Sequence, residues 1–135
     1  MVDTERHERL IEIFQELAEL NVHTPVIVEG KRDAAALREL GLKGDIIVYN
    51  TGLSMHEFSE SVLQEHAQVV LLMDWDSTGQ TLQDKLAHEL AGCWESNERY
   101  RRILRALCQK EIKDMEGVPG LIRRLSLNAI ARPEG

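Results

Sequence analysis

The sequence predicts an α/β fold in which a mainly parallel, four-stranded sheet is flanked by helices. Two apolar runs indicate its central strands: Val26–Val28, which ends at Glu29, and Val69–Met73, which ends at Asp74. Apolar runs bounded by turn residues are typical of strands that are covered on both faces. The segments between the strand signals repeat apolar residues every three or four positions, as amphipathic helices do. Strands separated by such helices imply βαβ units and parallel pairing.

Helix and strand signals alternate through the first half of the chain. Asp3 or Thr4 can cap a first helix, whose apolar residues recur at helical spacing. A short helix is expected from about Arg32 to Leu40, with Gly41 as its C-terminal stop. The segment Asp45–Tyr49 contains three β-favouring residues in a row and predicts the second strand.

The same alternation continues through the second half. Ser54 and Glu57 form a capping box that opens a helix, and another helix follows the second apolar run after a short turn. A further helix is expected from about Asn97 to Cys108. The segment Glu111–Met115 predicts a fourth strand, and Pro119 suits the first turn of a last helix.

The length of 135 residues indicates one domain. We expect a helix over residues 1–21 packed on a domain over residues 22–131, followed by a disordered tail over residues 132–135. No apolar stretch approaches the roughly 18 residues of a membrane helix, and the charged N-terminus is unlike a signal peptide. Cys93 and Cys108 have no cysteine or histidine at metal-ligand spacing, which is typical of reduced thiols in a cytoplasmic protein.

The net charge of −7 is unevenly distributed. Residues 1–96 hold 7 Lys or Arg against 18 Asp or Glu, whereas residues 97–135 hold 9 against 5. An acidic body repels polynucleotides at a distance, but the basic C-terminal third can offer a local surface to a phosphate backbone. The same charges could instead form an ordinary solvated helix face.

Three carboxylates follow the two predicted central strands. Glu29 comes directly after the first strand, while Asp74 and Asp76 follow the other with Trp75 between them. Ligands gather at the carboxyl ends of strands in open α/β sheets, and alternation along an extended segment places the two aspartates on one side. Oxygen-only ligand sets select hard ions. The sequence therefore predicts a Mg²⁺ site for phosphate chemistry, in which Mn²⁺ can substitute.

Two segments carry a family resemblance. VIVEGKRDAAAL at residues 26–37, followed by LMDWDSTG at residues 72–79, resembles the Toprim domain. That domain is shared by topoisomerases, bacterial-type primases, OLD-family nucleases and the nucleases that mature ribosomal RNA. The resemblance covers about residues 22–125 and is closest to small stand-alone, primase-like Toprim proteins of archaea. It implies a Rossmann-like version of the predicted sheet.

The resemblance also implies roles for the three acids. Glu29 corresponds to the family's general acid/base, which is also a metal ligand, and Asp74 and Asp76 correspond to its Mg²⁺-binding pair. Two positions depart from the pattern: Ser77 stands where many relatives carry a basic residue, and Thr78 where some topoisomerases carry a third acid. Because no DNA gate or nucleophilic-tyrosine domain is evident, topoisomerase activity by this chain alone is not expected.

The expected function is a metal-dependent nucleic-acid phosphotransfer module with Glu29, Asp74 and Asp76 as its catalytic residues. It is expected to be nuclease-like rather than primase-like, since no glycine-rich cradle for a nucleoside triphosphate is evident. The expected partner is RNA or DNA, with a protein partner or a homo-oligomer adding affinity. The candidate phosphate contacts are basic residues. Four of them interrupt the apolar stripe of the helix expected from about Asn97 to Cys108, so they are expected on its solvent side. The candidates are Lys31 and Arg32 and, on that helix, Arg99, Arg101, Arg102 and Arg105.

Two other functions fit the same residues. The strand followed by Asp-x-Asp-x-Thr also matches the haloacid-dehalogenase phosphatases, in which Asp74 would be a covalent nucleophile. That chemistry needs a later lysine and acid, for which Lys110 or Lys113 with Asp114 would have to serve, and it leaves Glu29 unexplained. The other alternative is a Toprim fold that binds nucleic acid or a protein without turnover.

Overall fold

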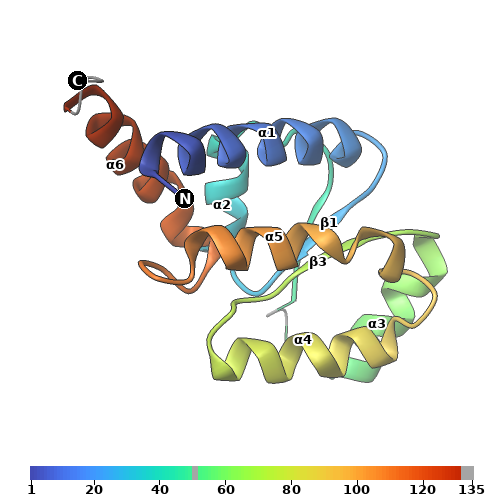
Figure 1. Cartoon of the computed structure of the whole chain (residues 1–135). Helices are drawn as coiled ribbons and strands as arrows, with labels where there is room; N and C mark the ends of the chain where they lie inside the picture. The colour runs from blue at the N-terminus through green and yellow to red at the C-terminus, as the bar shows by residue number, and fades with distance from the viewer. Residues whose placement is uncertain (50–51, 132–135) are drawn as a thin grey trace.

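A computed structural model of the chain describes residues 1–49 and 52–131 (Figure 1). Within these ranges the chain forms six α-helices, two short 3-10 helices and three strands. The α-helices are α1 (Asp3–Asn21), α2 (Lys31–Glu39), α3 (Met55–Glu65), α4 (Ser77–Glu89), α5 (Arg99–Cys108) and α6 (Val118–Ala131). The strands are β1 (Val26–Val28), β2 (Ile46–Val48) and β3 (Val70–Leu72), and the 3-10 helices are η1 (Glu95–Asn97) and η2 (Met115–Gly117).

The three strands pair in parallel in the order β2-β1-β3. β1 is central, with Val26 opposite Ile46 of β2 on one side and Val70 of β3 on the other. Every residue of β1 and β3 is buried, which confirms that these apolar runs are strands covered on both faces. Because parallel neighbours end at the same edge of a sheet, the residues that follow β1 and β3 come together there.

Helices cover both faces of the sheet (Figure 1). Val26 and Val28 belong to a core cluster that includes residues of α1, α2, α5 and α6, such as Leu104. Ile27 faces the other way and belongs to a second cluster with residues of α3 and α4, such as Leu86. The alternation of side chains along β1 therefore divides the apolar interior into two layers.

The fourth strand predicted at Glu111–Met115 is wrong for the described part of the chain, where residues 111–114 form a loop before η2. Side chains occupy the outer edge of β3 instead. The Gln83 side chain accepts a hydrogen bond from the Met73 N–H at 3.2 Å and donates to the carbonyl two residues earlier at 3.4 Å. Asn97 Nδ2 donates to the Val69 carbonyl at 3.2 Å. Because side chains satisfy these backbone groups, this edge is not available to a further strand.

The local signals at helix ends are confirmed at Ser54 but not at the first helix. Ser54 forms the predicted capping box, in which its hydroxyl accepts from the N–H of Glu57 at 3.1 Å. The prediction that Asp3 or Thr4 caps the first helix is wrong, because α1 begins at Asp3 and its N-cap is Val2. The apolar Val2 has no side-chain acceptor, so only acidic residues in the first turn favour this helix end.

The last helix begins where the sequence predicts, since α6 starts at Val118 and Pro119 lies in its first turn. Gly41 has a φ of 103°, which confirms it as the left-handed stop after α2. The predicted tail at residues 132–135 lies outside the described residues. No helix in the described ranges is both long enough and apolar enough to cross a membrane.

Candidate metal centre

Glu29 and Asp74 are in direct contact at the carboxyl edge of the sheet. Glu29 immediately follows β1, and Asp74 lies two residues beyond Leu72, the last residue of β3. The Asp74 N–H donates a hydrogen bond to Glu29 Oε1 at 3.2 Å. Parallel pairing of β1 with β3 is what brings these two acids together, because Val28 and Leu72 lie opposite each other in the sheet.

The electrostatics of this pair favour a bound cation. Burial, followed by repulsion from the Glu29 charge, raises the pKa of Asp74 to about 8. Burial also raises the pKa of Glu29, although the hydrogen bonds from Asp74 oppose that shift. At neutral pH without a cation, Asp74 therefore holds a proton over much of the population. A hard cation that displaced this proton would relieve the repulsion, so the two carboxyl groups fit a divalent metal chemically.

Asp76 lies near this pair, but its side chain is also used to begin α4. Its Oδ1 accepts a hydrogen bond from the Gly79 N–H at 2.7 Å, which makes Asp76 the N-cap of α4. Its charge is close enough to raise the pKa of Glu29. Among the described residues no three His, Cys, Asp or Glu side chains form a ready metal-binding group. The expected convergence of three carboxylates is therefore seen for Glu29 and Asp74 only, with Asp76 alongside.

Asp33 is a site residue that the sequence reasoning did not identify. Asp33 is 7% exposed, and its carboxylate accepts two backbone hydrogen bonds, from the Gly30 N–H at 3.1 Å and from the Glu116 N–H at 3.0 Å. These bonds fix the turn after Glu29 and join it to η2. Burial raises the pKa of Asp33, and its charge raises the pKa values of Glu29 and Asp74. The spacing of Asp33 three residues after Gly30, at a helix start, was the available signal.

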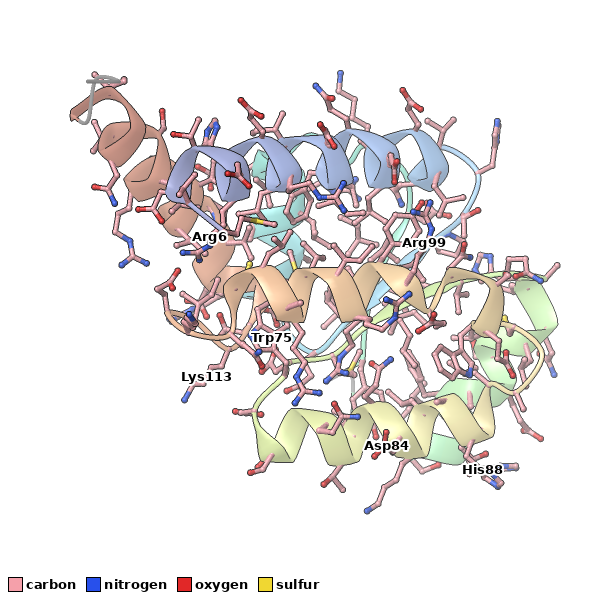
Figure 2. The ribbon with its side chains drawn as sticks, viewed as in Figure 1. Arg6, Trp75, Asp84, His88, Arg99 and Lys113 are labelled. Carbon is pink, nitrogen blue, oxygen red and sulfur yellow. The ribbon has the colours of Figure 1, made fainter. Side chains whose placement is uncertain are left out.

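Trp75 separates the two aspartates and faces away from them into the core, as strand alternation predicts. Its backbone N–H donates to the Lys113 carbonyl at 2.8 Å, and its indole Nε1 donates to the Ile112 carbonyl at 2.8 Å. Figure 2 shows Trp75 beside the loop that carries Lys113. The same loop carries Asp114, whose charge also raises the pKa of Asp74. The loop that replaces the expected fourth strand is therefore attached to the acidic site.

Arg101 contradicts the expectation that the four arginines of α5 lie on the solvent side. It is 7% exposed, because it shares the buried face of α5 with Leu104 and Cys108 at helical spacing. Its guanidinium donates to three oxygens: Nε to the Met73 carbonyl at 2.9 Å, Nη2 to the Asp74 carbonyl at 2.7 Å, and Nη1 to a side-chain oxygen on α4 at 2.9 Å. The spacing from 101 to 104 and 108 could have predicted this burial.

The other arginines of α5 are exposed, as expected. Arg99 pairs with Glu16 of α1 at 3.2 Å, and its guanidinium lies 4.5 Å from the centre of the Tyr100 ring. Arg102 pairs with Glu98 at 3.3 Å. Arg105 Nη1 lies 3.4 Å from the Gln80 side-chain oxygen that also binds Arg101.

A groove of about 360 Å³ runs between α4 and α5, and one of its lining residues is Arg101, which binds the Asp74 carbonyl. Gln80, one turn after the N-cap of α4, lines the groove together with Arg102 and Arg105. Lys31 and Arg32 are exposed in the first turn of α2, just after Glu29, where Arg32 pairs with Glu116 at 3.5 Å. The structure thus places basic side chains on two elements that border the acidic pair.

Known proteins resemble this chain in sequence and in fold. A family model of the Toprim domain matches residues 24–101. The chain is 38% identical over 128 residues to a UPF0292 protein of Methanosarcina barkeri, which covers 90% of this chain and 86% of that protein. It is 33% identical over 133 residues to a UPF0292 protein of Pyrococcus furiosus, and this match covers 97% of this chain and 95% of that protein. A solved structure of a protein from Aquifex aeolicus, at 23% identity and a TM-score of 0.62, covers 78% of this chain and 94% of that one and has the same fold.

The family match includes both acids of the contact, Glu29 and Asp74, together with Asp76. It also reaches Arg101, the buried arginine that holds the Asp74 carbonyl. The chain belongs to the Toprim domain family, in which its archaeal relatives are small UPF0292 proteins.

Proposed function

We propose that this protein is a metal-dependent nucleic-acid phosphotransfer module, and that it cleaves phosphodiester bonds rather than joining nucleotides. Family membership supports the coarser part of this proposal, a metal-dependent module that works with nucleic acid. The observation that carries metal-dependent chemistry is the contact between Glu29 and Asp74, in which the pKa of Asp74 is raised to about 8. Groups with strongly shifted pKa values that cluster at one edge of a sheet are typical of catalytic sites. Cleavage is preferred to joining because the sequence has no evident glycine-rich cradle for a nucleoside triphosphate.

The proposed ligands of the cation are Glu29, Asp74 and Asp76, with Mg²⁺ as the natural ion and Mn²⁺ as a substitute. A bound divalent ion supplies charge stabilisation to a phosphodiester and to its leaving oxygen. Glu29 is also proposed as the general acid/base, because its raised pKa moves it toward the range in which a carboxyl group exchanges protons efficiently. Asp76 would hold its position through the cap of α4 while its charge faces Glu29.

Nucleic acid would be held by basic residues on both sides of the acidic pair. Arg102 and Arg105 line the groove between α4 and α5, while Lys31 and Arg32 border the pair at the start of α2. Arg99 would extend the α5 surface. A net charge of −7 opposes long-range attraction of polynucleotides, so we also propose that a protein partner or a second copy of the chain supplies part of the affinity.

The two alternatives predict different behaviour. In a non-catalytic module, the same surface would bind nucleic acid without turnover. In a haloacid-dehalogenase-like phosphatase, Asp74 would be phosphorylated by a small phosphomonoester. Asp114 does lie near enough to raise the pKa of Asp74, which is the observation in favour of that chemistry. Glu29, in contact with Asp74, has no role in it.

The test is an incubation of the wild type and Glu29→Gln with labelled single-stranded, duplex and structured RNA and DNA in Mg²⁺ or Mn²⁺. Cleavage that requires the metal and is lost in Glu29→Gln, but not in the exposed α1 control Glu12→Gln, supports the proposal. Binding without cleavage under every condition favours the non-catalytic module. Release of phosphate from p-nitrophenyl phosphate, retained in Glu29→Gln and lost in Asp74→Asn, favours the phosphatase.

A further inference from the structure

Arg101 is an unusual arginine, because its guanidinium is buried against neutral oxygens. Two of its partners are the carbonyls of Met73 and Asp74, and the third is the side-chain amide oxygen of Gln80. Burying an arginine is unfavourable unless its donors are satisfied, and here each of its three nitrogens has a partner in the described chain. The residue is therefore built into the fold at the end of β3, beside the acidic pair.

The Asp74 backbone is held from several directions. Its carbonyl accepts from Arg101 Nη2 at 2.7 Å, and its N–H donates to Glu29 at 3.2 Å. The first turn of α4 packs on the same carbonyl, since a Cβ added to Gly79 would lie 2.2 Å from it. These contacts determine how the Asp74 side chain leaves the main chain.

The choice of partners also has an electrostatic consequence. An arginine that formed an ion pair with Glu29 or Asp74 would cover the oxygens that a cation needs. Arg101 binds backbone carbonyls instead, while its charge is felt by both carboxyl groups at longer range. It can therefore offset part of the repulsion in the cluster and leave the carboxylate oxygens free.

We propose that Arg101 is a positioning residue for the metal centre: it fixes the Asp74 main chain from α5 and supplies a buried positive charge without occupying the carboxylates. The inference rests on the proposed metal-dependent function. Arg101 lines the same groove as Arg102 and Arg105, but it differs from them because it is buried and all three of its nitrogens are bonded within the fold. Residues that hold a metal ligand without touching the ion are known to act in this way, because their loss weakens metal binding.

The test measures Mn²⁺ affinity by electron paramagnetic resonance in the absence of nucleic acid. Arg101→Lys keeps the charge but cannot reach three oxygens with one ammonium group, so the dissociation constant should rise by about tenfold or more. The matched control is Arg123→Lys on the exposed side of α6, which should bind Mn²⁺ as the wild type does. Gln80→Ala, which frees one nitrogen of the guanidinium and leaves the core intact, should weaken Mn²⁺ binding by a smaller factor.

Nucleic-acid affinity in chelator separates positioning from direct contact. Arg101→Lys should retain that affinity, whereas a loss there with unchanged Mn²⁺ binding would mean that Arg101 contacts phosphate and would overturn the inference. Wild-type Mn²⁺ affinity in folded Arg101→Lys would overturn it as well, by leaving only a structural role. If Arg101→Lys does not fold, Gln80→Ala decides, and unchanged Mn²⁺ affinity in that variant rejects the inference. A wild-type protein that binds no Mn²⁺ would instead overturn the proposed function itself.

Discussion

The main-chain N–H of Asp74 donates a hydrogen bond to the side chain of Glu29, across 45 residues of sequence. This bond joins the ends of two neighbouring parallel strands, so the acidic pair depends on the sheet rather than on any single loop. The Glu29 carboxylate receives this hydrogen bond, whereas the Asp74 carboxyl group lies near the charge of Glu29. The pKa values of both groups respond to that arrangement.

The first prediction concerns the pH dependence of stability. The pKa of Asp74 is about 8 in the folded protein and about 4 in an unfolded chain, so between these values the folded state holds more protons. Its contribution to stability is therefore full below about pH 4 and is lost as the pH rises through about 8. In chelator, Asp74→Asn should gain thermal stability relative to the wild type as the pH is raised from about 5 to about 8.5.

Mg²⁺ provides the complementary measurement. Because a cation binds the ionised carboxylate, added Mg²⁺ should raise the melting temperature of the wild type more at high pH than at low pH, and should have little effect on Asp74→Asn. If the difference in melting temperature between the wild type and Asp74→Asn in chelator did not change with pH, the assignment of the raised pKa to Asp74 would be contradicted.

The second prediction concerns Asp76, which both caps α4 and faces the acidic pair. Asp76→Ala should lower the free energy of unfolding by about 1 kcal/mol, since it removes the acceptor for the Gly79 N–H. Asp76→Asn should match or exceed the wild type in chelator, because asparagine caps equally well and removes a repelling charge. Urea unfolding measures both values. Asp84→Ala, an exposed position on α4, is the control and should change stability by less than about 0.5 kcal/mol.

The third prediction concerns the closed edge of the sheet. Gln83→Leu leaves the Met73 N–H and the Leu71 carbonyl without their side-chain partner, so it should destabilise the protein by about 1–3 kcal/mol. Gln64→Leu, at an exposed position of α3, makes the same chemical change and should have little effect. Equal effects of the two substitutions in urea unfolding would show that β3 does not depend on Gln83.

The parts of the fold that could be predicted are those specified by nearby residues. The apolar run at Val26–Val28, the capping box at Ser54 and the stop at Gly41 each act within a few positions, and the structure contains all three. The acids that follow β1 and β3 could also be placed, because parallel pairing brings the two strand ends to one edge. Family resemblance added the expectation that they act together.

The parts that could not be predicted depend on contacts between distant segments. The fourth strand was expected at Glu111–Met115, but the side chains of Gln83 and Asn97 satisfy the outer edge of β3. Arg101 was expected on the solvent side because it interrupts the apolar stripe of its helix. Its spacing to Leu104 and Cys108 could have predicted the burial, but its partners, the carbonyls that follow β3, belong to a distant segment and could not be inferred. Asp33 carried a local signal in its spacing from Gly30, but its hydrogen bond from Glu116 of η2 joins distant segments and could not be inferred.

The position of Trp75 gives the protein an optical reporter of its own. Trp75 is 7% exposed, lies between Asp74 and Asp76 in the sequence, and donates a hydrogen bond from its indole to the Ile112 carbonyl. The emission wavelength of an indole shifts with the electric field around it. A cation that binds to or leaves the acidic cluster should therefore shift the emission maximum of Trp75. The chain has two tryptophans, and the other, Trp94, lines the groove between α4 and α5. With Trp94 replaced by phenylalanine, occupancy of the centre can be followed by fluorescence without any label.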